Sequence, residues 1–125
     1  MQPEPETAPF GKSLRDLRKR AAMSQRDLSE RVGIDFTYLS KIENARVEPP
    51  SEAVIRKLAR ELAVPLQRDA TELGDELTVL AGKFPSDLAA LLQEHSYTLA
   101  ELRRSLSGDV RTREDWLKRL RGDPE

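Results

Sequence analysis

The sequence predicts an all-α protein, with an N-terminal bundle of short helices followed by a C-terminal helical extension. Apolar residues recur three and four positions apart over most of the 125 residues, which is the spacing of one face of a helix. No stretch alternates apolar and polar residues as a half-buried strand does. Glycine, proline, serine and aspartate separate the periodic stretches, so the chain divides into many short helices.

Residues 1–9 are predicted to be a disordered tail. They include three prolines and no apolar run, so they are poorly suited to a helix or a core. They also lack the basic start and apolar stretch of a signal peptide. No later segment approaches the roughly 20 apolar residues that span a bilayer. Cysteine is absent, which excludes disulfides and fits a reducing compartment, so we expect a cytoplasmic protein with no membrane partner.

Four helices are expected between residues 10 and 66, which we take as one domain. Ser24 is the expected N-cap of the second helix, with Asp27 three residues later as its acidic partner. Gly33 follows where a helix end favours a left-handed residue, and Pro49 and Pro50 interrupt the chain before the fourth helix. The predicted helices are Phe10–Ala22, Ser24–Val32, Asp35–Glu43 and a fourth that is capped by Ser51 and ends before Pro65.

Residues 67–125 are predicted to form a helical C-terminal region that serves in dimerisation. Leucine recurs there at helical spacing, and glycine or proline separates one stripe from the next. We interpret the stripes as core or dimer contacts, although a single compact monomer could equally bury them. They consist of Leu73, Leu77, Leu80 and Ala81; Leu88, Leu91 and Leu92; Leu99, Leu102 and Leu106; and a last helix over Thr112–Arg121 with Trp116, Leu117 and Leu120.

The second and third helices have the pattern of a helix-turn-helix unit, because a tight turn containing Gly33 joins two short helices. At about 100° per residue, the third helix places Leu39 and Ile42 on one face. The opposite face carries Phe36, Thr37, Ser40, Lys41 and Asn44. We therefore expect one face of this helix in the core and the other exposed.

The exposed face has side chains that suit the major groove of DNA. Lys41 can donate to O6 and N7 of guanine, and Phe36 can contact the methyl group of thymine. Thr37 and Ser40 can bind base edges or phosphates. Two of these residues have ordinary alternatives. Phe36 could be half-buried against the second half of the chain, and Lys41 could be a solvated lysine.

Phosphate contacts are expected at the edges of the motif. Ser24 and Gln25 lie at the positive N-terminus of the second helix, where side chains and backbone amides favour an anion. Arg46, just beyond the third helix, can bind another phosphate. Gln25 could instead be an ordinary helix-start residue.

Charge is distributed unevenly along the chain. The formal net charge is −1, yet residues 12–62 hold 12 basic against 8 acidic residues, and residues 65–125 hold 9 against 12. Phosphate binding requires positive charge on one face only, so a locally basic N-terminal half is compatible with a DNA partner.

No group of residues predicts catalysis, a metal or a cofactor. His95 is the only histidine and has no second ligand at metal spacing. Glu114 and Asp115 are adjacent on a predicted helix and diverge, so they do not form a general acid and base pair. No glycine-rich phosphate loop is present. We therefore expect a binding protein rather than an enzyme.

Residues 11–64 resemble the Cro/C1-type helix-turn-helix family, also called the xenobiotic-response-element (XRE) family. The resemblance implies a five-helix, lambda-repressor-like domain that binds double-stranded operator DNA as a homodimer and represses transcription. The matching pieces are Leu14–Arg18, Ser24 and Gln25, Leu28, Val32 and Gly33, Tyr38–Asn44, and Pro50 and Ser51 through Leu62.

The resemblance also implies roles for individual residues. Arg18 and Glu43 occupy an ion pair that ties the first helix to the end of the third, and breaking it would cost about 3–5 kcal/mol if it is partly buried. Asp35 is better regarded as a cap than as a contact. Base or phosphate contacts are implied for Gln25, Phe36, Thr37, Ser40 and Lys41, and phosphate contacts for Ser24, Tyr38, Asn44 and Arg46.

Two positions depart from the family pattern. Ala45 and Ala22 stand where the family usually or frequently has glycine. If Ala45 is left-handed it costs roughly 1 kcal/mol, so a rearranged loop is expected.

The C-terminal region loosely resembles that of short damage-response repressors, over Phe84–Leu88 and Thr112–Trp116. In those proteins it dimerises and is cut by a partner metalloprotease. Two alternatives stay open. One is a dimerisation extension without a switch, and the other is an antitoxin or adaptor whose C-terminal helices bind a partner protein such as a toxin.

Overall fold

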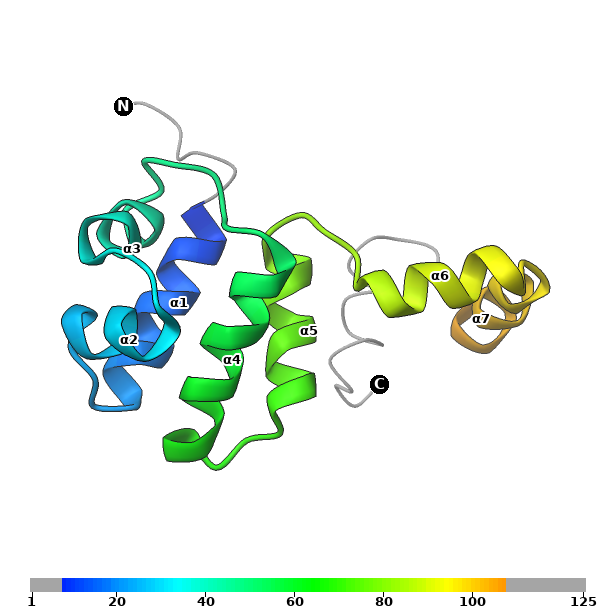
Figure 1. The fold of residues 1–125 in the computed structure, drawn as a ribbon. Coiled ribbons are helices and arrows are strands. Elements are labelled where there is room, and N and C mark those ends of the chain that lie inside the picture. Colours follow the sequence, from blue (N-terminus) through cyan, green and yellow to red (C-terminus); the bar gives the residue numbers. More distant parts are fainter. Residues whose placement is uncertain (1–7, 108–125) are drawn as a thin grey trace. The chain divides into compact units, whose positions relative to one another are not determined.

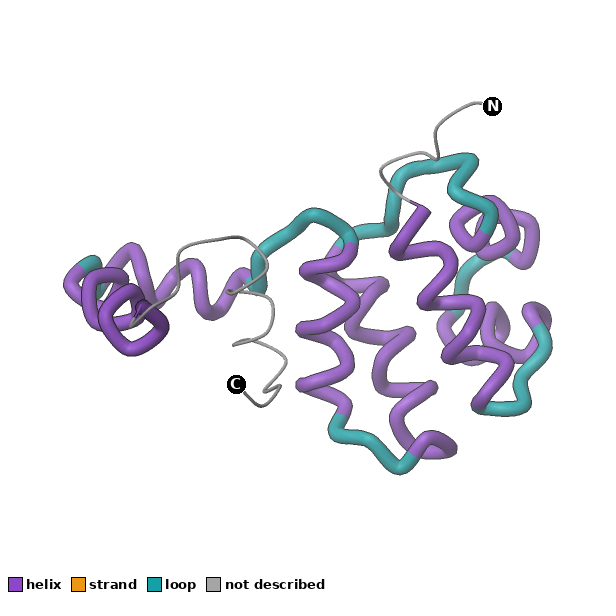
Figure 2. Tube along the Cα trace, turned by 180° about the vertical axis from the view of Figure 1, so that it is seen from behind, coloured by secondary structure: helices purple, strands orange, loops and turns teal. Residues whose placement is uncertain are grey.

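A computed structural model describes residues 8–107, which contain seven helices and no strand (Figures 1 and 2). The predicted all-α class is therefore confirmed. The predicted tail, except for its last two residues, and the predicted helix over Thr112–Arg121 lie outside the described residues. The helices are α1 (Ala8–Arg20), α2 (Gln25–Val32), α3 (Phe36–Glu43), α4 (Glu52–Leu66), α5 (Ala70–Leu80), α6 (Ser86–Glu94) and α7 (Tyr97–Ser107).

The chain divides into two compact units, and α1 to α5 belong to the first, which ends at Pro85. One apolar core joins these five helices, with α4 and α5 side by side (Figures 1 and 2). Burying each large apolar side chain stabilises the fold by about 1.5–3 kcal/mol. The largest fully buried apolar side chains are Phe10, Leu14, Leu28, Leu39, Ile42, Ile55, Leu58, Leu62, Leu73 and Leu77.

The helix α5 completes the five-helix bundle that the resemblance implied. The domain predicted from the sequence ends at residue 66, whereas the compact unit extends through Pro85. The physical reason is that Leu73 and Leu77 are buried in the core shared with α4. Arg56 of α4 adds a polar link, since its guanidinium lies 2.9 Å from the carboxylate of Asp75 in α5.

Several helix boundaries differ from the prediction. The first helix begins at Ala8, which is buried, rather than at Phe10, so the prediction of a disordered tail is wrong for its last two residues. The second and third helices begin one residue later than predicted, because Ser24 and Asp35 are their N-caps.

The first helix ends at Arg20 rather than Ala22, because Ala22 has a left-handed backbone with φ of 58°. The fourth helix continues through Pro65 to Leu66, so the prediction that Pro65 begins the connection is wrong. The fixed φ of proline fits a helix, and Pro65 lies in the last turn of α4, so it removes one helical hydrogen bond, to the carbonyl of Glu61, and the helix ends at the next residue.

All five helices of the first unit end in the same way, with one left-handed residue. This residue is Ala22 after α1 (φ 58°), Gly33 after α2 (φ 80°), Ala45 after α3 (φ 56°), Gln67 after α4 (φ 54°) and Gly82 after α5 (φ 76°). In each case the next residue donates its N–H to a carbonyl five positions earlier, for example at 2.9 Å from Arg46 to Lys41. Ala45 therefore stays left-handed, and the rearranged loop that the sequence analysis considered is absent.

The second unit begins at Ser86 and contains α6 and α7, which contact each other. None of the residues of α6 is buried. Its Leu88 and Leu91 are 41% and 53% exposed, and Leu99 and Leu102 of α7 are 44% and 45% exposed. The predicted leucine stripes of this region thus lie largely on the surface of the described chain.

Replacing Ala45 by glycine is expected to stabilise the first unit by about 0.5–1 kcal/mol. A left-handed alanine is strained by about 1–2 kcal/mol, and the greater backbone entropy that glycine loses on folding offsets part of that gain. Urea unfolding monitored by circular dichroism measures the change. Ala22→Gly is expected to act in the same direction.

Gly33→Ala is the matched control for both variants. An added Cβ at Gly33 would meet no atom within 4 Å, so only its backbone conformation is tested. We expect this substitution to destabilise the unit by about 1 kcal/mol. A stabilising Gly33→Ala, or a destabilising Ala45→Gly, would contradict the account.

Candidate nucleic-acid interface

Side-chain caps fix the starts of α2 and α3. The hydroxyl of Ser24 accepts from the N–H of Asp27 at 3.0 Å, and the carboxylate of Asp27 accepts from the N–H of Ser24 at 3.2 Å. Asp35 accepts from the N–H of Thr37 at 2.7 Å and from its hydroxyl. Each cap satisfies amide groups that a helix start otherwise leaves without partners. The two helices therefore begin at fixed residues on either side of a short turn.

The helix α3 has one buried and one exposed face. Leu39 and Ile42 are 0% and 2% exposed and belong to the core. The opposite side, which we call the outward face, consists of Phe36, Thr37, Ser40 and Lys41. All of these are exposed except Ser40, which is half-buried. Tyr38 is also half-buried and packs against the core.

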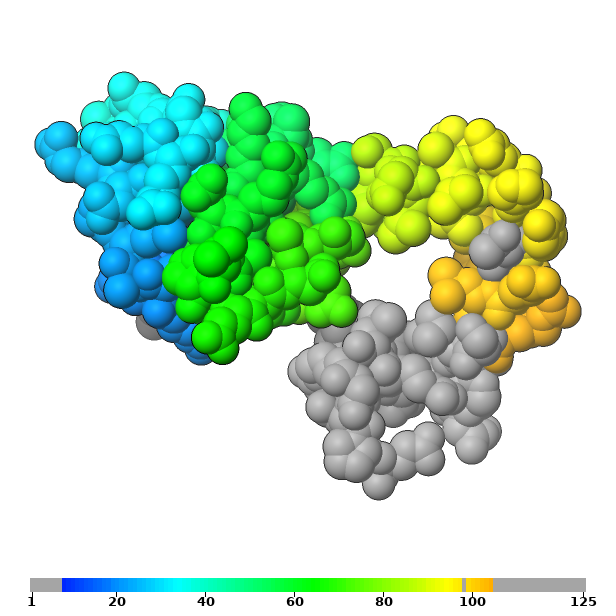
Figure 3. All heavy atoms as spheres, turned by 60° about the horizontal axis from the view of Figure 1, so that its bottom comes forward, coloured from blue at the N-terminus to red at the C-terminus, as the bar shows by residue number. Residues whose placement is uncertain are grey.

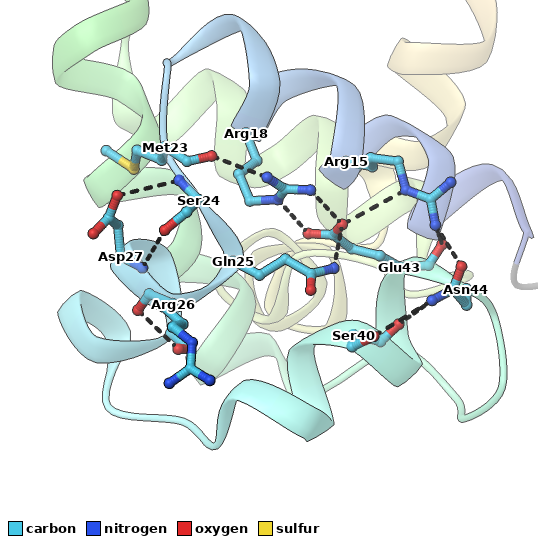
Figure 4. Close-up of polar contacts among 11 residues, drawn as sticks. Arg15, Arg18, Met23, Ser24, Gln25, Arg26, Asp27, Ser40, Glu43 and Asn44 are labelled. Carbon is cyan, nitrogen blue, oxygen red and sulfur yellow. Dashed lines mark hydrogen bonds and ion pairs between the residues drawn. The ribbon is translucent and has the colours of Figure 1, made fainter.

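The buried carboxylate of Glu43 is bound by side chains from α1 and α2 (Figure 4). Arg18 donates to it through two nitrogens, from Nε to Oε2 at 2.7 Å and from Nη2 to Oε1 at 2.9 Å. Gln25 donates from Nε2 to Oε1 at 3.1 Å, and Arg15 Nε lies 3.6 Å from the same oxygen. We call these four residues the Glu43 network.

Arg18 also connects the network to the turn before α2. Its Nη1 donates to the backbone carbonyl of Met23 at 2.9 Å (Figure 4). Two-point pairing of this kind suits the planar fork of arginine and fixes orientation as well as distance. One guanidinium therefore ties α1 to the entry of α2 and to the end of α3.

Gly11 brings the backbone of α1 against the last turn of α3. A Cβ at Gly11 would lie 2.6 Å from the carbonyl oxygen of Ile42 and 2.7 Å from that of Glu43. These are backbone atoms that cannot turn aside. The close approach therefore requires glycine, and it fixes the position of α3 along α1.

Five residues predicted to contact DNA make internal side-chain bonds. The hydroxyl of Thr37 donates to Asp35, and that of Ser40 accepts from Asn44 at 3.5 Å. Ser24 caps α2, and Gln25 donates to Glu43. Asn44 accepts a hydrogen bond from Arg15 and donates to the carbonyl of Ser40 at 2.9 Å. Arg46 is exposed beyond the end of α3. The predicted residues thus lie around one surface of α2 and α3, but part of their bonding capacity supports the fold.

The profile of a family described as a helix-turn-helix domain matches residues 9–73 of the chain. The chain belongs to this helix-turn-helix family. A curated relative from Bacillus subtilis (strain 168), described as the uncharacterized HTH-type transcriptional regulator RghRB, is 40% identical over 60 residues, which cover 48% of this chain and 43% of the relative. The chain therefore spans less than half of the length of that relative. No solved structure matches the chain.

The helix-turn-helix domain contains two basic residues at this surface that the sequence analysis missed. Arg15 is bound to the Glu43 network, and Arg26 of α2 lies over the ring of Phe36 with its Cζ 4.8 Å from the ring centroid. Helical spacing could have suggested Arg15, which is one turn before Arg18 on the same helix. Arg26 meets Phe36 only through the packing of α2 against α3, so no local pattern indicates that contact.

Hydrogen bonding shifts the acidity of both capping aspartates in the helix-turn-helix domain. Bonds from the hydroxyl and amide of Thr37 lower the pKa of Asp35 below its usual value of 3.8. Bonds from the amide and hydroxyl of Ser24 lower the pKa of Asp27 in the same direction. Both caps are therefore formed by the charged carboxylate.

The described part of the chain has no group of three or more histidine, aspartate or glutamate residues that could hold a metal ion. None of the helices within it has the length and apolar character needed to cross a membrane.

Breaking the Arg18–Glu43 pair is expected to destabilise the helix-turn-helix domain strongly. Arg18→Met leaves the buried Glu43 carboxylate with its weaker partners, so unfolding should become easier by about 3–5 kcal/mol. The double variant Arg18→Met/Glu43→Leu should recover part of this loss, since neither charge stays buried without its partner. Urea unfolding of the two single variants and the double variant measures the coupling. Additive losses would show that the two side chains are not coupled.

Asp35→Asn is expected to flatten the acid end of the stability profile. The pKa of Asp35 is lower in the folded chain than in the unfolded chain. The charged carboxylate therefore stabilises the fold at pH values above the unfolded pKa. This stabilisation is lost as the pH falls through the pKa of the folded chain. Asparagine also caps helices but does not titrate. The stability difference between wild type and Asp35→Asn should therefore be constant near neutral pH and shrink as the pH falls below the usual pKa of 3.8. A difference that does not shrink below this pKa would contradict the assignment.

Proposed function

We propose that this protein is a DNA-binding transcriptional repressor that inserts α3 into the major groove of double-stranded operator DNA. The observation that supports this most is the construction of α3. Its inner face is fixed by the core and by the Glu43 network, while Phe36, Thr37 and Lys41 stay exposed on the other side. A recognition helix requires this combination of a rigid backbone and free side chains.

The chemistry of the outward face suits base contacts. Lys41 supplies a cation for O6 and N7 of guanine, and the hydroxyl of Ser40 can donate to a base edge. The hydroxyl of Thr37 donates to Asp35, so it is available to a base edge as an acceptor. Phosphates would be bound by Arg46 and by the amides at the start of α2. Ser24, Gln25, Tyr38 and Asn44 are proposed as further phosphate contacts at the same rim, in addition to their internal contacts.

We propose that the repressor binds as a homodimer through its C-terminal region. The exposed leucines of α6 and α7 supply apolar surface for a symmetric contact between two copies. Two recognition helices of such a dimer would enter successive major grooves about 34 Å apart. The operator is then expected to be an inverted repeat.

Lys41→Ala is expected to weaken operator binding by about 1–3 kcal/mol and to relax the preference for one base. Fluorescence anisotropy against the upstream DNA of the protein's own gene, and against random duplex, separates these effects. Lys57→Ala is the matched control, because it removes the same charge from an exposed position of α4. If Lys41→Ala binds both duplexes as the wild type does, α3 is not the recognition helix.

Arg46→Ala is expected to weaken binding to operator and random DNA alike. Loss of a phosphate contact should reduce the slope of log affinity against log salt by about one. Titrations at several salt concentrations measure this slope. A change confined to operator DNA would instead assign Arg46 to base recognition.

A second function, supported by the same exposed leucines, is binding of a partner protein, as in an antitoxin or adaptor. A regulatory partner could be a toxin or a metalloprotease. Light scattering of the purified full chain distinguishes the two functions when combined with the anisotropy assay. A dimer with salt-dependent DNA binding supports the repressor, whereas a monomer that binds no DNA even at low salt supports the adaptor.

A further inference from the structure

Arg26 and Phe36 form a stacked pair at the start of α2 and α3. The Cζ atom of Arg26 lies 4.8 Å from the centroid of the Phe36 ring, within the range of a cation–π contact. Phe36 is the first residue of α3 and is 37% exposed, and Arg26 is exposed as well. The pair therefore lies at the N-terminal end of the outward face.

The guanidinium of Arg26 has donors to spare. Among the described residues its side chain makes no hydrogen bond or ion pair, and the nearby carboxylate of Asp27 is engaged in the cap with Ser24. All N–H groups of a guanidinium lie in its plane. The contact of Cζ with the ring does not use these N–H groups, so they are available to donate. The contact with Phe36 therefore restrains the guanidinium of Arg26 but leaves its N–H groups available for hydrogen bonds.

We propose that Arg26 and Phe36 act together to recognise a thymine followed by a guanine in the major groove. Phe36 would contact the C5 methyl group of the thymine, and Arg26 would donate two hydrogen bonds to O6 and N7 of the adjacent guanine. This inference rests on the proposed function and adds Arg26 as a specificity-determining residue. It also places the thymine that Phe36 contacts directly before the guanine that Arg26 contacts.

The geometry of the stack favours two neighbouring bases over one. The Cζ atom of Arg26 is 4.8 Å from the ring centroid, which is nearer to the rise of one base step, about 3.4 Å, than to that of two steps, about 6.8 Å. The two side chains can therefore reach two neighbouring bases, one side chain to each. Thymine presents a methyl group to the groove and guanine presents two acceptors, which match an aromatic ring and a guanidinium respectively.

The same chemistry extends to methylated DNA. A 5-methylcytosine carries its methyl group at the position where thymine carries one. A methylated cytosine followed by guanine therefore offers the pair the same methyl group and the same two acceptors. An unmethylated cytosine lacks the methyl group and is expected to bind more weakly.

Selection from a random duplex library with the full chain is the first step of the test. The bound sequences are expected to share a thymine–guanine step in each half-site. Duplexes are then compared in which that thymine is replaced by uracil, which removes only the methyl group. The affinity of the wild type should fall about fourfold for each half-site, the factor for one apolar carbon. Phe36→Ala should bind both duplexes equally.

Replacing the guanine by 7-deazaguanine, which lacks the N7 acceptor, tests Arg26. Loss of the two-point contact should lower the DNA affinity of the wild type by about 5- to 150-fold. The affinity of Arg26→Ala should be the same for guanine and for 7-deazaguanine. Arg26→Lys retains the charge but not the planar fork, so it should keep the salt dependence and lose the preference for guanine. Arg60→Ala, which removes an exposed arginine from α4, is the control for charge. Circular dichroism and thermal unfolding verify that each variant is folded.

The outcomes separate the two proposals. A chain that selects no DNA sequence overturns the proposed function, and this inference with it. A chain that selects a site but tolerates uracil and 7-deazaguanine overturns only the inference. If Arg26→Ala lowers the salt slope while Arg26→Lys keeps full affinity and base preference, Arg26 binds a phosphate and the proposal for guanine is wrong.

Discussion

The buried carboxylate of Glu43 holds α1, α2 and α3 in one arrangement. The helix α3 has only eight residues, and isolated helices of that length are unstable in water. Its position therefore comes from tertiary contacts, namely the core, the two-point bond to Arg18 and the close approach at Gly11. Because a buried charge is costly without partners, the network tolerates little displacement. The direction of the outward face follows from this constraint.

Local patterns predicted most of the helix-turn-helix domain. The caps at Ser24 and Asp35 and the left-handed turn at Gly33 are short-range features, and the two faces of α3 follow from helical periodicity. The sequence did not predict the internal bond of Gln25 or the contact of Arg26 with Phe36. Both depend on how α2 crosses α3, which no local spacing encodes. The leucine spacing of α5 indicated a core or dimer contact, but it did not show that this helix packs on α4, so the predicted domain ended before it.

The described part of the second unit, residues 86–107, buries few of its apolar side chains. Its helices α6 and α7, of 9 and 11 residues, are shorter than the roughly 12–15 residues at which isolated helices become marginally stable. Leu88, Leu91, Leu99 and Leu102 nevertheless keep much of their surface exposed. Helices of this kind gain stability when another surface covers their apolar side. The two candidate functions therefore differ in what supplies that surface, a second copy of the chain or a different protein.

The division of α3 into an inner and an outer face has a consequence for how regulators with this scaffold can diverge. None of Phe36, Thr37, Ser40 and Lys41 belongs to the Glu43 network, and none of them is buried. If α3 is the recognition helix, as we propose, mutations at these positions alter recognition at little cost in stability, because they leave the core unchanged. A duplicated gene could therefore acquire a new target sequence by a few point mutations while its product continued to fold throughout.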